Sequence, residues 1–389
     1  MDERTENAVV ETPATGLSPA VDPCATSADA SVMMAMSGGV DSSVAALLLH
    51  EAGYAVTGAT MKLFGADVVA PGCDSSCCSA DDVEDARAVC RRIGVPHYTF
   101  NFGELFGEAV IDRFCDAYLG GTTPNPCIDC NRFLKFDALQ RRRRELGLGF
   151  VATGHYARRA WDEKAGRWQL LRARDAAKDQ SYVLYHLSQD ALAHMLFPLG
   201  TLTKPEVREM ARSRGFVTAE KPESQDICFV PDGDYAAFIE RRRGRSAAFG
   251  PGDIVDRAGD VLGEHRGLIH YTVGQRKGIG VAAPAPLYVL AKDAAANRLV
   301  VGFADDLLVR GVVAHDVNLI AAACLEGLRA VQVKTHYRQR PVGAVAQQTG
   351  VDELTITFDD PQRAAAPGQA AVLYDGDIVV GGGTIARCF

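Results

Sequence analysis

The chain has 389 residues, a formal net charge of −8 and 47% hydrophobic residues. This length and composition suffice for two or three domains with cores of their own. The acidic balance excludes a globally basic nucleic-acid-binding protein, so a nucleic acid would have to meet a local basic patch. No apolar run approaches the ~20 residues of a membrane span.

The eleven cysteines are an odd, dispersed set in a chain without a secretory signal. This usage favours a reducing, cytoplasmic compartment and thiols with chemical or metal-binding roles, and it argues against a disulfide framework. Residues 1–30 are rich in Ala, Thr, Pro, Asp and Glu and lack an apolar core segment. We therefore expect a disordered tail there, with no assigned role.

Strands and helices alternate from residue 31 onward. The expected strands are 31–36, 54–61, 96–101 and 150–153, and the expected helices are 43–52, 79–93, 104–119, 132–146 and one that begins at Thr203. Repeated βα units predict a parallel sheet covered by helices on both faces. Ligands bind such sheets at the carboxyl ends of the strands, so Ser37–Ser42, Met61 and Gly154-His155 are expected on one rim.

The pattern changes after about residue 230, where helical periodicity fades and alternating β patterns appear. The predicted fold class is α/β: a parallel-sheet domain at 31–233, a small mixed central domain at 234–302, and a C-terminal antiparallel β-barrel at 303–389, with a sandwich as the alternative. Asp375-Gly376 is expected to form a hairpin turn within the last domain.

The stretch Ser37-Gly38-Gly39-Val40-Asp41-Ser42 joins a buried strand to a helix. Free backbone N–H groups and the positive end of the helix dipole make such a turn an anion site, and the glycines let an oxyanion approach. No lysine follows these glycines, which excludes the kinase-type P-loop. The pattern resembles the pyrophosphate loop of ATP pyrophosphatases; the alternative is an ordinary βα turn.

Three cysteines are distinguished by their neighbours. The prolines in Thr123-Pro124-Asn125-Pro126-Cys127 form a rigid turn that feeds a helix, and a thiol at Cys130 near the helix N-terminus is expected to have a lowered pKa. Cys228 follows about one hundred residues later and could meet it over the rim of the sheet. Cys127 and Cys130 form a C-x-x-C pair without the second pair of a zinc ribbon.

The other cysteines and the two basic runs have simpler interpretations. Cys90, Cys115 and Cys324 are expected to be small buried hydrophobic residues, and Cys73, Cys77 and Cys78 are read as bystanders in a loop, with a metal or sulfur site as the alternative. The runs 141–144 and 241–245 are either solvated helix ends or RNA-binding patches.

An adenylating loop combined with two reactive cysteines suggests sulfur transfer to an ATP-activated oxygen. The sequence closely resembles the tRNA-specific 2-thiouridylase family of PP-loop ATP pyrophosphatases from about residue 33 to its end. The matching stretches are Ala35–Ser43, Thr123–Pro126, Cys130-Asn131, Phe133, Lys135-Phe136, Ala152–Tyr156, Lys178–Tyr182, Gly274-Gln275-Arg276-Lys277-Gly278 and Pro367–Gln369.

The resemblance implies a role for each matching residue. ATP would bind at Ala35, Met36, Ser37, Gly38, Gly39, Val40, Asp41, Ser42, Met61 and Gly154. Cys130 would be the nucleophile, and Cys228 would carry a persulfide charged by an upstream sulfur-donor protein. Asn125, Pro126 and Cys127 would approach the target base, and His155, Lys178, Asp179, Gln180, Tyr337, Arg338 and Gln369 would face tRNA.

The implied reaction is adenylation of the C2 oxygen of the wobble uridine with Mg²⁺-ATP, followed by sulfur transfer. Position 127 is often aspartate in this family and is cysteine here, so Cys127, Cys130 and Cys228 could instead hold an iron–sulfur cluster. The alternative functions are another PP-loop ATP pyrophosphatase that acts on a small substrate, and an iron–sulfur RNA-binding protein without catalysis.

Overall fold

The computed structural model describes residues 30–63, 80–222, 227–230, 232–244 and 250–389. The tail at 1–29 and the loop with Cys73, Cys77 and Cys78 lie outside these ranges, as does Ser79 at the start of the second expected helix. Within the described ranges, no helix is long and apolar enough to cross a membrane.

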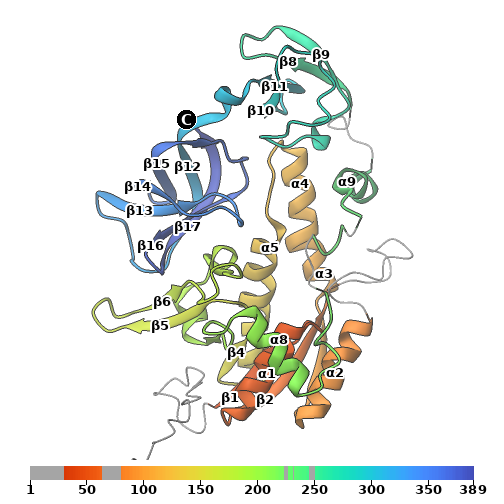
Figure 1. Ribbon diagram of the computed structural model, residues 1–389, viewed down its shortest axis with the longest axis vertical. Coiled ribbons are helices and arrows are strands. Elements are labelled where there is room, and N and C mark those ends of the chain that lie inside the picture. Colours follow the sequence, from red (N-terminus) through yellow and green to blue (C-terminus); the bar gives the residue numbers. More distant parts are fainter. Residues whose placement is uncertain (1–29, 64–79, 223–226, 231, 245–249) are drawn as a thin grey trace, which may run out of the picture.

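The N-terminal part is a five-stranded parallel sheet in the order β3-β2-β1-β4-β7 (Figure 1). Its strands are β1 (Ser31–Ala35), β2 (Ala55–Lys62), β3 (His97–Asn101), β4 (Phe150–Ala152) and β7 (Met195–Leu196). Its helices are α1 (Val40–Glu51), α2 (Ala80–Ile93), α3 (Gly103–Phe106), α4 (Arg113–Leu119), α5 (Pro126–Asp129), α6 (Leu139–Glu145), α7 (Gln189–Ala193) and α8 (Lys204–Ser213). The π-helical segments η1 (Gly107–Asp112) and η2 (Cys130–Ala138) join α3 to α4 and α5 to α6.

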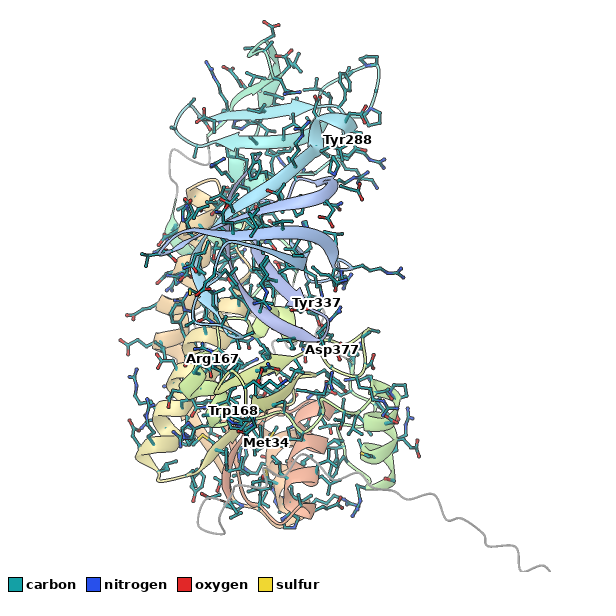
Figure 2. The ribbon with its side chains drawn as sticks, turned by 90° about the vertical axis from the view of Figure 1, so that its left-hand side faces the viewer. Met34, Arg167, Trp168, Tyr288, Tyr337 and Asp377 are labelled. Carbon is teal, nitrogen blue, oxygen red and sulfur yellow. The ribbon has the colours of Figure 1, made fainter. Side chains whose placement is uncertain are left out.

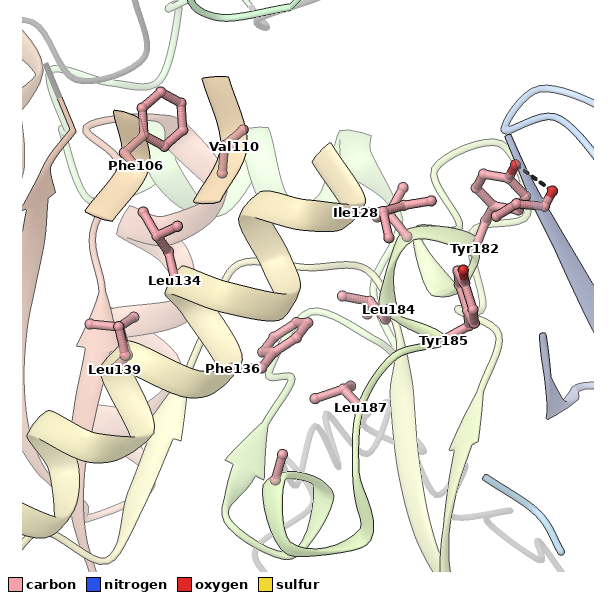
Figure 3. Packing of buried hydrophobic residues seen from close by; sticks show 14 of the residues in the cluster. Phe106, Val110, Ile128, Leu134, Phe136, Leu139, Tyr182, Leu184, Tyr185 and Leu187 are labelled. Atoms are coloured by element: carbon pink, nitrogen blue, oxygen red, sulfur yellow. Dashed lines mark hydrogen bonds between the residues drawn. The ribbon is translucent and has the colours of Figure 1, made fainter. Parts of the chain in front are cut away.

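Alternating side chains of the sheet build two separate cores, as the period of a strand requires. Met33 of β1 belongs to a cluster with Phe106, Phe114 and Leu134, which come from the helices between β3 and β4. Figure 3 shows Phe106 and Leu134 in this cluster. Val32 and Met34 point the other way, into a cluster with residues of α1, α2 and α8. Helices therefore cover both faces, as predicted.

The C-terminal part is a closed six-stranded antiparallel barrel, which confirms the predicted barrel and excludes the sandwich. Its strands are β12 (Leu308–Leu319), β13 (Leu328–Lys334), β14 (Val342–Gly350), β15 (Glu353–Arg363), β16 (Ala370–Asp375) and β17 (Ile378–Cys388). They follow the order β12-β15-β14-β13-β16-β17, and pairing of β12 with β17 closes the ring. Gly376, at φ +58°, turns the chain between β16 and β17, as expected of Asp375-Gly376.

Two features were absent from the sequence-based expectation. A hairpin of β5 (Arg158–Asp162) and β6 (Arg167–Leu171) leaves the N-terminal part and extends the barrel sheet through pairing of Leu171 with Ile378. A helix, α9 (Tyr235–Arg243), precedes the central mixed sheet, whose strands are β8 (Gly252–Val255), β9 (Val261–His265), β10 (Tyr288–Asp293) and β11 (Arg298–Gly302). Figure 1 shows the central sheet at the opposite end of the molecule from β1 and α1, with α4 rising toward it.

Candidate active site

The predicted anion loop lies between β1 and α1 and is held by its own side chains. Gly38 has φ +71°, which favours glycine, and Gly39 caps α1 in an extended conformation. The backbone N–H of Ser37 donates to Ser42 Oγ at 3.2 Å, and Ser42 Oγ donates to the Gly39 carbonyl at 3.0 Å. The loop therefore has a defined shape, with the N-terminus of α1 directed into it.

The end of β4 lies against this loop, as the expected rim requires. A Cβ atom at Gly154 would come within 2.9 Å of the Asp41 carbonyl carbon and the Ser42 nitrogen. Met61, at the end of β2, is buried, and the Met36 N–H donates to the Ala59 carbonyl of that strand at 2.8 Å. Only a residue without a side chain at position 154 permits this close approach.

Two lysines that the sequence analysis missed bring positive charge to the loop. Lys204 Nζ lies 2.7 Å from both carboxylate oxygens of Asp41, and Tyr156 donates its hydroxyl to the same carboxylate at 2.8 Å. Lys221 Nζ donates to the Gly38 carbonyl at 3.2 Å. Lys204 lies in the Thr203-Lys204-Pro205-Glu206 motif, which indicated only a helix start, so its second role had no sequence signal.

Lys221 also contacts two carboxylates of α2. Its Nζ lies 2.6 Å from Asp82 Oδ1 and 2.6 Å from Asp85 Oδ2. Burial by itself would lower the pKa of Lys221, but hydrogen bonds to these carboxylates raise that pKa overall. The lysine therefore stays charged. It contacts both the anion loop and α2, and it lies in the segment that precedes Cys228.

Cys130 lies one turn deeper in its helix than predicted. The helix begins at Pro126 because the Asn125 side chain accepts the Cys127 N–H at 3.1 Å and proline fits the first helical position. Cys127 is exposed in that first turn, whereas Cys130 is half-buried and its N–H already donates to the carbonyls of Pro126 and Cys127. The expected helix start near Arg132 is wrong, since Asn125-Pro126 itself is a start signal.

A short chain of contacts connects the surroundings of Cys130 and Cys228. Asp129, next to Cys130, accepts a hydrogen bond from Arg113 Nε at 3.4 Å. Phe114, next to Arg113, packs edge-on against Phe229 at 5.3 Å between ring centroids, and Phe229 follows Cys228 directly. Both thiols border the hydrophobic cluster of Figure 3. The segments that carry Cys130 and Cys228, about one hundred residues apart, therefore both contact α4.

The turn before Cys127 lies where three parts of the chain meet. Gln369 Nε2, in the barrel, donates to the Thr123 carbonyl at 2.7 Å, and the Thr123 N–H donates to the Pro367 carbonyl at 2.7 Å. Lys292 of the central sheet donates to the Thr122 carbonyl at 3.3 Å, and burial lowers its pKa to about 8. Barrel and central sheet together fix this turn.

The remaining residues predicted to face tRNA fall into two groups. Tyr337 and Arg338 are exposed on the barrel, and Lys178 is half-exposed. His155 and Asp179 are buried. Burial, with Lys135 nearby, holds the pKa of His155 well below its usual value.

Asp179 and Gln180 hold the polypeptide around them. Asp179 accepts hydrogen bonds from the backbone N–H groups of Ala173 and Ser181, and Gln180 accepts one from the Tyr156 N–H at 2.9 Å. In this conformation, both side chains shape the loop that presents Lys178.

The described residues contain no group of three His, Cys, Asp or Glu side chains that could hold a metal ion. Cys127, Cys130 and Cys228 are therefore not gathered into a metal-binding group in this structure. Cys90 and Cys115 are buried as predicted, and burial raises the pKa of each thiol to about 11. The prediction for Cys324 is wrong, because this residue is exposed in the irregular segment between β12 and β13.

Residues 141–144 and 241–243, the described arginines of the two basic runs, lie in the last turns of helices and make ion pairs. In α6, Arg142 pairs with Glu145 at 2.6 Å, while Arg143 is buried and donates to Gln140 and to backbone carbonyls. In α9, Arg242 contacts Asp112 at 3.0 Å. These contacts favour the helix-end interpretation, in which cations also complement the helix dipole.

The barrel contacts the helix that carries Cys130 through Arg132. Arg132 donates to Asp316 Oδ2, and His186 Nε2 lies 3.8 Å from the same oxygen. Asp316 has φ +53° within β12, a conformation uncommon for a residue with a side chain. A second contact with the barrel is made by the Tyr182 hydroxyl, which donates to the Ala370 carbonyl at 2.9 Å, the dashed line of Figure 3.

We expect Asp316→Asn to lower the free energy of unfolding by about 1–2 kcal/mol, because it removes the carboxylate charge that accepts the hydrogen bond from Arg132. Asp316→Gly removes the same charge and also relieves the backbone conformation, so its loss of stability should be smaller than that of Asp316→Asn. Urea unfolding measures the effect, with the exposed Asp305→Asn as control. If the Asp316→Asn variant were as stable as the unaltered protein, these contacts would contribute nothing.

Stability should also depend on the protonation of His186. Burial, and then Arg132, lowers the pKa of His186 to about 4 from 6.5, although Asp316 opposes the shift. Below pH 6.5 the unfolded chain therefore binds a proton that the folded protein excludes, and stability falls as the pH drops. This residue should account for about 2 kcal/mol of the loss between pH 7 and pH 5. His186→Gln should remove that share, and the exposed His50→Gln should not; an unchanged pH slope in His186→Gln would contradict the assignment.

Comparison with known proteins identifies the family of the chain. The chain matches family models described as tRNA methyl transferase HUP domain at residues 30–232, tRNA methyl transferase PRC-barrel domain at 236–303 and aminomethyltransferase beta-barrel domain at 309–385. It is 48% identical to a tRNA-specific 2-thiouridylase MnmA of Carboxydothermus hydrogenoformans, over 92% of this chain and 97% of that protein.

Further relatives give the same result. The chain is 50% identical to the tRNA-specific 2-thiouridylase MnmA of Moorella thermoacetica, over 91% of this chain and 98% of that protein. A solved 4-thiouridine synthetase–RNA complex with bound ATP aligns over 55% of this chain and 50% of its own, with 18% identity and a TM-score of 0.36, which is too low to add to the argument. On the curated relatives and the family models, the chain belongs to the tRNA-specific 2-thiouridylase family.

Proposed function

We propose that this protein is a cytoplasmic tRNA 2-thiouridylase. It adenylates the C2 oxygen of the wobble uridine with ATP and replaces that oxygen with sulfur from a protein persulfide, giving 2-thiouridine, AMP and pyrophosphate. The observation that carries the proposal is the convergence of the Cys130 and Cys228 segments on α4, in a domain whose β1–α1 turn is built as an anion site.

The first step uses the loop from Ala35 to Ser42, with Met61 and Gly154 beside it. The C2 oxygen attacks the α-phosphate of ATP, and pyrophosphate leaves. Loop N–H groups and the start of α1 stabilise the negative charge on the departing phosphates. The close approach of Gly154 to Asp41 and Ser42 supports this assignment, because it fixes the α1 N-terminus against the end of the sheet.

Lys204 and Asp41 form the charged part of this site. Mg²⁺ bound to ATP phosphates needs only one or two protein carboxylates, and Asp41 fits that need. When bound, the ion would neutralise part of the negative charge on the phosphates. Lys204, 9% exposed at its side chain, orients the Asp41 carboxylate through their ion pair.

The second step uses the two thiols. A donor protein charges Cys228 with an outer sulfur. The Cys130 thiolate attacks the inner sulfur of this persulfide, a Cys130–Cys228 disulfide forms, and hydrosulfide is released. Hydrosulfide adds to C2, and AMP leaves with the former C2 oxygen. Alternatively, the outer sulfur of the persulfide attacks C2 directly and AMP leaves. The Cys130 thiolate then attacks the Cys228 sulfur, which breaks its bond to the sulfur on C2 and gives the same products. A thiol reductant then restores both cysteines.

The tRNA would lie across the turn from Asn125 to Cys127 and the barrel. Exposed Cys127 faces outward at the start of the helix that carries Cys130, and Tyr337 and Arg338 offer a ring and a cation on the barrel surface. A base pulled from its stack can be read at its edges and stacked on such a ring. The proposed reaction uses Cys130 and Cys228 as thiols, and no step passes through a cluster.

Mass analysis of tRNA nucleosides tests the proposal. The full chain, tRNA, ATP and a persulfide donor should yield 2-thiouridine, and omission of ATP should abolish it. The mass of the modified nucleoside also distinguishes the replacement of oxygen by sulfur from the addition of a methyl group. Consumption of ATP without any thiolated nucleoside would overturn the proposal in favour of a small-substrate ATP pyrophosphatase.

A further inference from the structure

The motif Gly274-Gln275-Arg276-Lys277-Gly278 plays no part in the chemistry above. It lies in the loop that enters β10, and the Gly274 N–H donates to the Val289 carbonyl of that strand at 2.8 Å. Figure 2 places Tyr288, the first residue of β10, near one end of the molecule and Met34 of β1 toward the other. The loop is therefore remote from the ATP site and requires a function of its own.

The loop has a preformed concave backbone. Gly274, Gly278 and Gly280 adopt φ values of +87°, +81° and +80°. Gln275 braces the turn: its Oε1 accepts the Thr272 N–H at 3.0 Å, and its Nε2 donates to the Lys277 carbonyl at 2.9 Å. Within the described residues, the backbone N–H groups of 276–280 have no acceptor. Successive free amides in such turns form a nest for an anion.

The surface around this backbone is hollow and positively charged. Residues 276 and 278–287 line a hollow of about 450 Å³. Arg276 and Lys277 are exposed, and neither makes an ion pair with any described residue. In the same part of the chain, Arg257 is held by Asp306 at 2.7 Å. Two cations without carboxylate partners, beside free amides, favour a phosphate ligand.

We propose that the loop from Gly274 to Gly280 binds a backbone phosphate of the tRNA, far from the base that reacts. This inference rests on the proposed function, which makes tRNA the substrate. Phosphate contacts position a nucleic acid without reading its sequence. The loop thus anchors the tRNA at the central sheet, while the uridine is presented at the turn beside Cys127.

Binding of tRNA to the full chain, measured by fluorescence anisotropy at several salt concentrations, tests the inference. Arg276→Ala with Lys277→Ala should weaken binding about tenfold or more at low salt. The slope of log affinity against log salt should become shallower by about 0.7–0.9, the contribution of one neutralised phosphate. In Gly278→Ala, the added Cβ atom would approach Gln275 Nε2 at 3.8 Å, and φ +81° is strained for alanine. This variant should weaken binding with a smaller change of slope.

The control is Arg298→Ala. Arg298 is an exposed cation on β11, paired with Asp293 at the end of the β10–β11 ladder away from Tyr288. It should leave affinity and slope unchanged. An unchanged affinity in the double variant, or an equal loss in Arg298→Ala, would overturn the inference. Loss of inorganic pyrophosphate binding with intact tRNA affinity would also overturn it, by identifying a free phosphate compound as the ligand.

Thiolation kinetics separate this inference from the proposed function. The double variant should raise the KM for tRNA and keep kcat, because neither cation approaches the reacting atoms. If the unaltered chain makes no 2-thiouridine, the proposed function fails, yet the dependence of tRNA binding on the loop remains measurable and decides the inference on its own.

Discussion

Cys130→Ser and Cys228→Ser are each expected to lower the yield of 2-thiouridine at least about a hundredfold, because a hydroxyl neither carries a persulfide nor attacks one at neutral pH. Both variants should still bind ATP, since neither residue contributes to the loop from Ser37 to Ser42. The measurement is nucleoside mass analysis under single-turnover conditions, with nucleotide binding followed in parallel.

Two other cysteines serve as matched controls. Cys324→Ser changes an exposed thiol on the barrel side, and Cys90→Ser changes a buried one between α2 and the sheet. Cys324→Ser should leave thiolation unchanged, and Cys90→Ser should affect stability more than the reaction at saturating ATP. Full activity in Cys228→Ser would remove the persulfide role from this residue.

Gly38→Ala is expected to abolish ATP binding and lower the free energy of unfolding by about 3 kcal/mol. A Cβ atom there would come within 2.6 Å of the Asp82 Cα atom, and φ +71° is strained for alanine. The anion loop would have to separate from α2 and lose the bond between Lys221 and the Gly38 carbonyl.

Gly53→Ala isolates the strain from the crowding. Gly53 has φ +88°, but a Cβ atom there meets nothing within 4 Å. This variant should therefore cost only about 1 kcal/mol and keep ATP affinity. Calorimetric titration with ATP and urea unfolding measure the two effects. Equal losses in Gly38→Ala and Gly53→Ala would show that the packing of the loop on α2 is unimportant.

The parallel sheet and its rim could be predicted because their signals are local. The apolar strand 31–36, the glycine turn and the helix after it follow one another in sequence, and Gly53, Gly94 and Gly215, each just past a helix, have the positive φ that favours glycine. Parallel strands then place all their carboxyl ends on one edge, which brings Gly154 to Asp41.

What the sequence could not give are contacts between segments far apart. Lys204 and Lys221 reach the loop only after α8 packs on α1, and nothing in their own neighbourhoods indicates it. The β5–β6 hairpin joins the barrel through one pair, Leu171 with Ile378, which depends on the docking of two parts of the chain. Similarly, Asp316 becomes a partner of Arg132 only through the bulged path of β12.

The most direct test follows the two sulfurs through one turnover. The protein, with Cys228 charged as a persulfide, is mixed with tRNA and ATP and quenched, and its peptides are mapped without reduction. A Cys130–Cys228 disulfide should appear in proportion to the 2-thiouridine formed. Thiolated tRNA accompanied by two thiols that stay reduced would contradict the account.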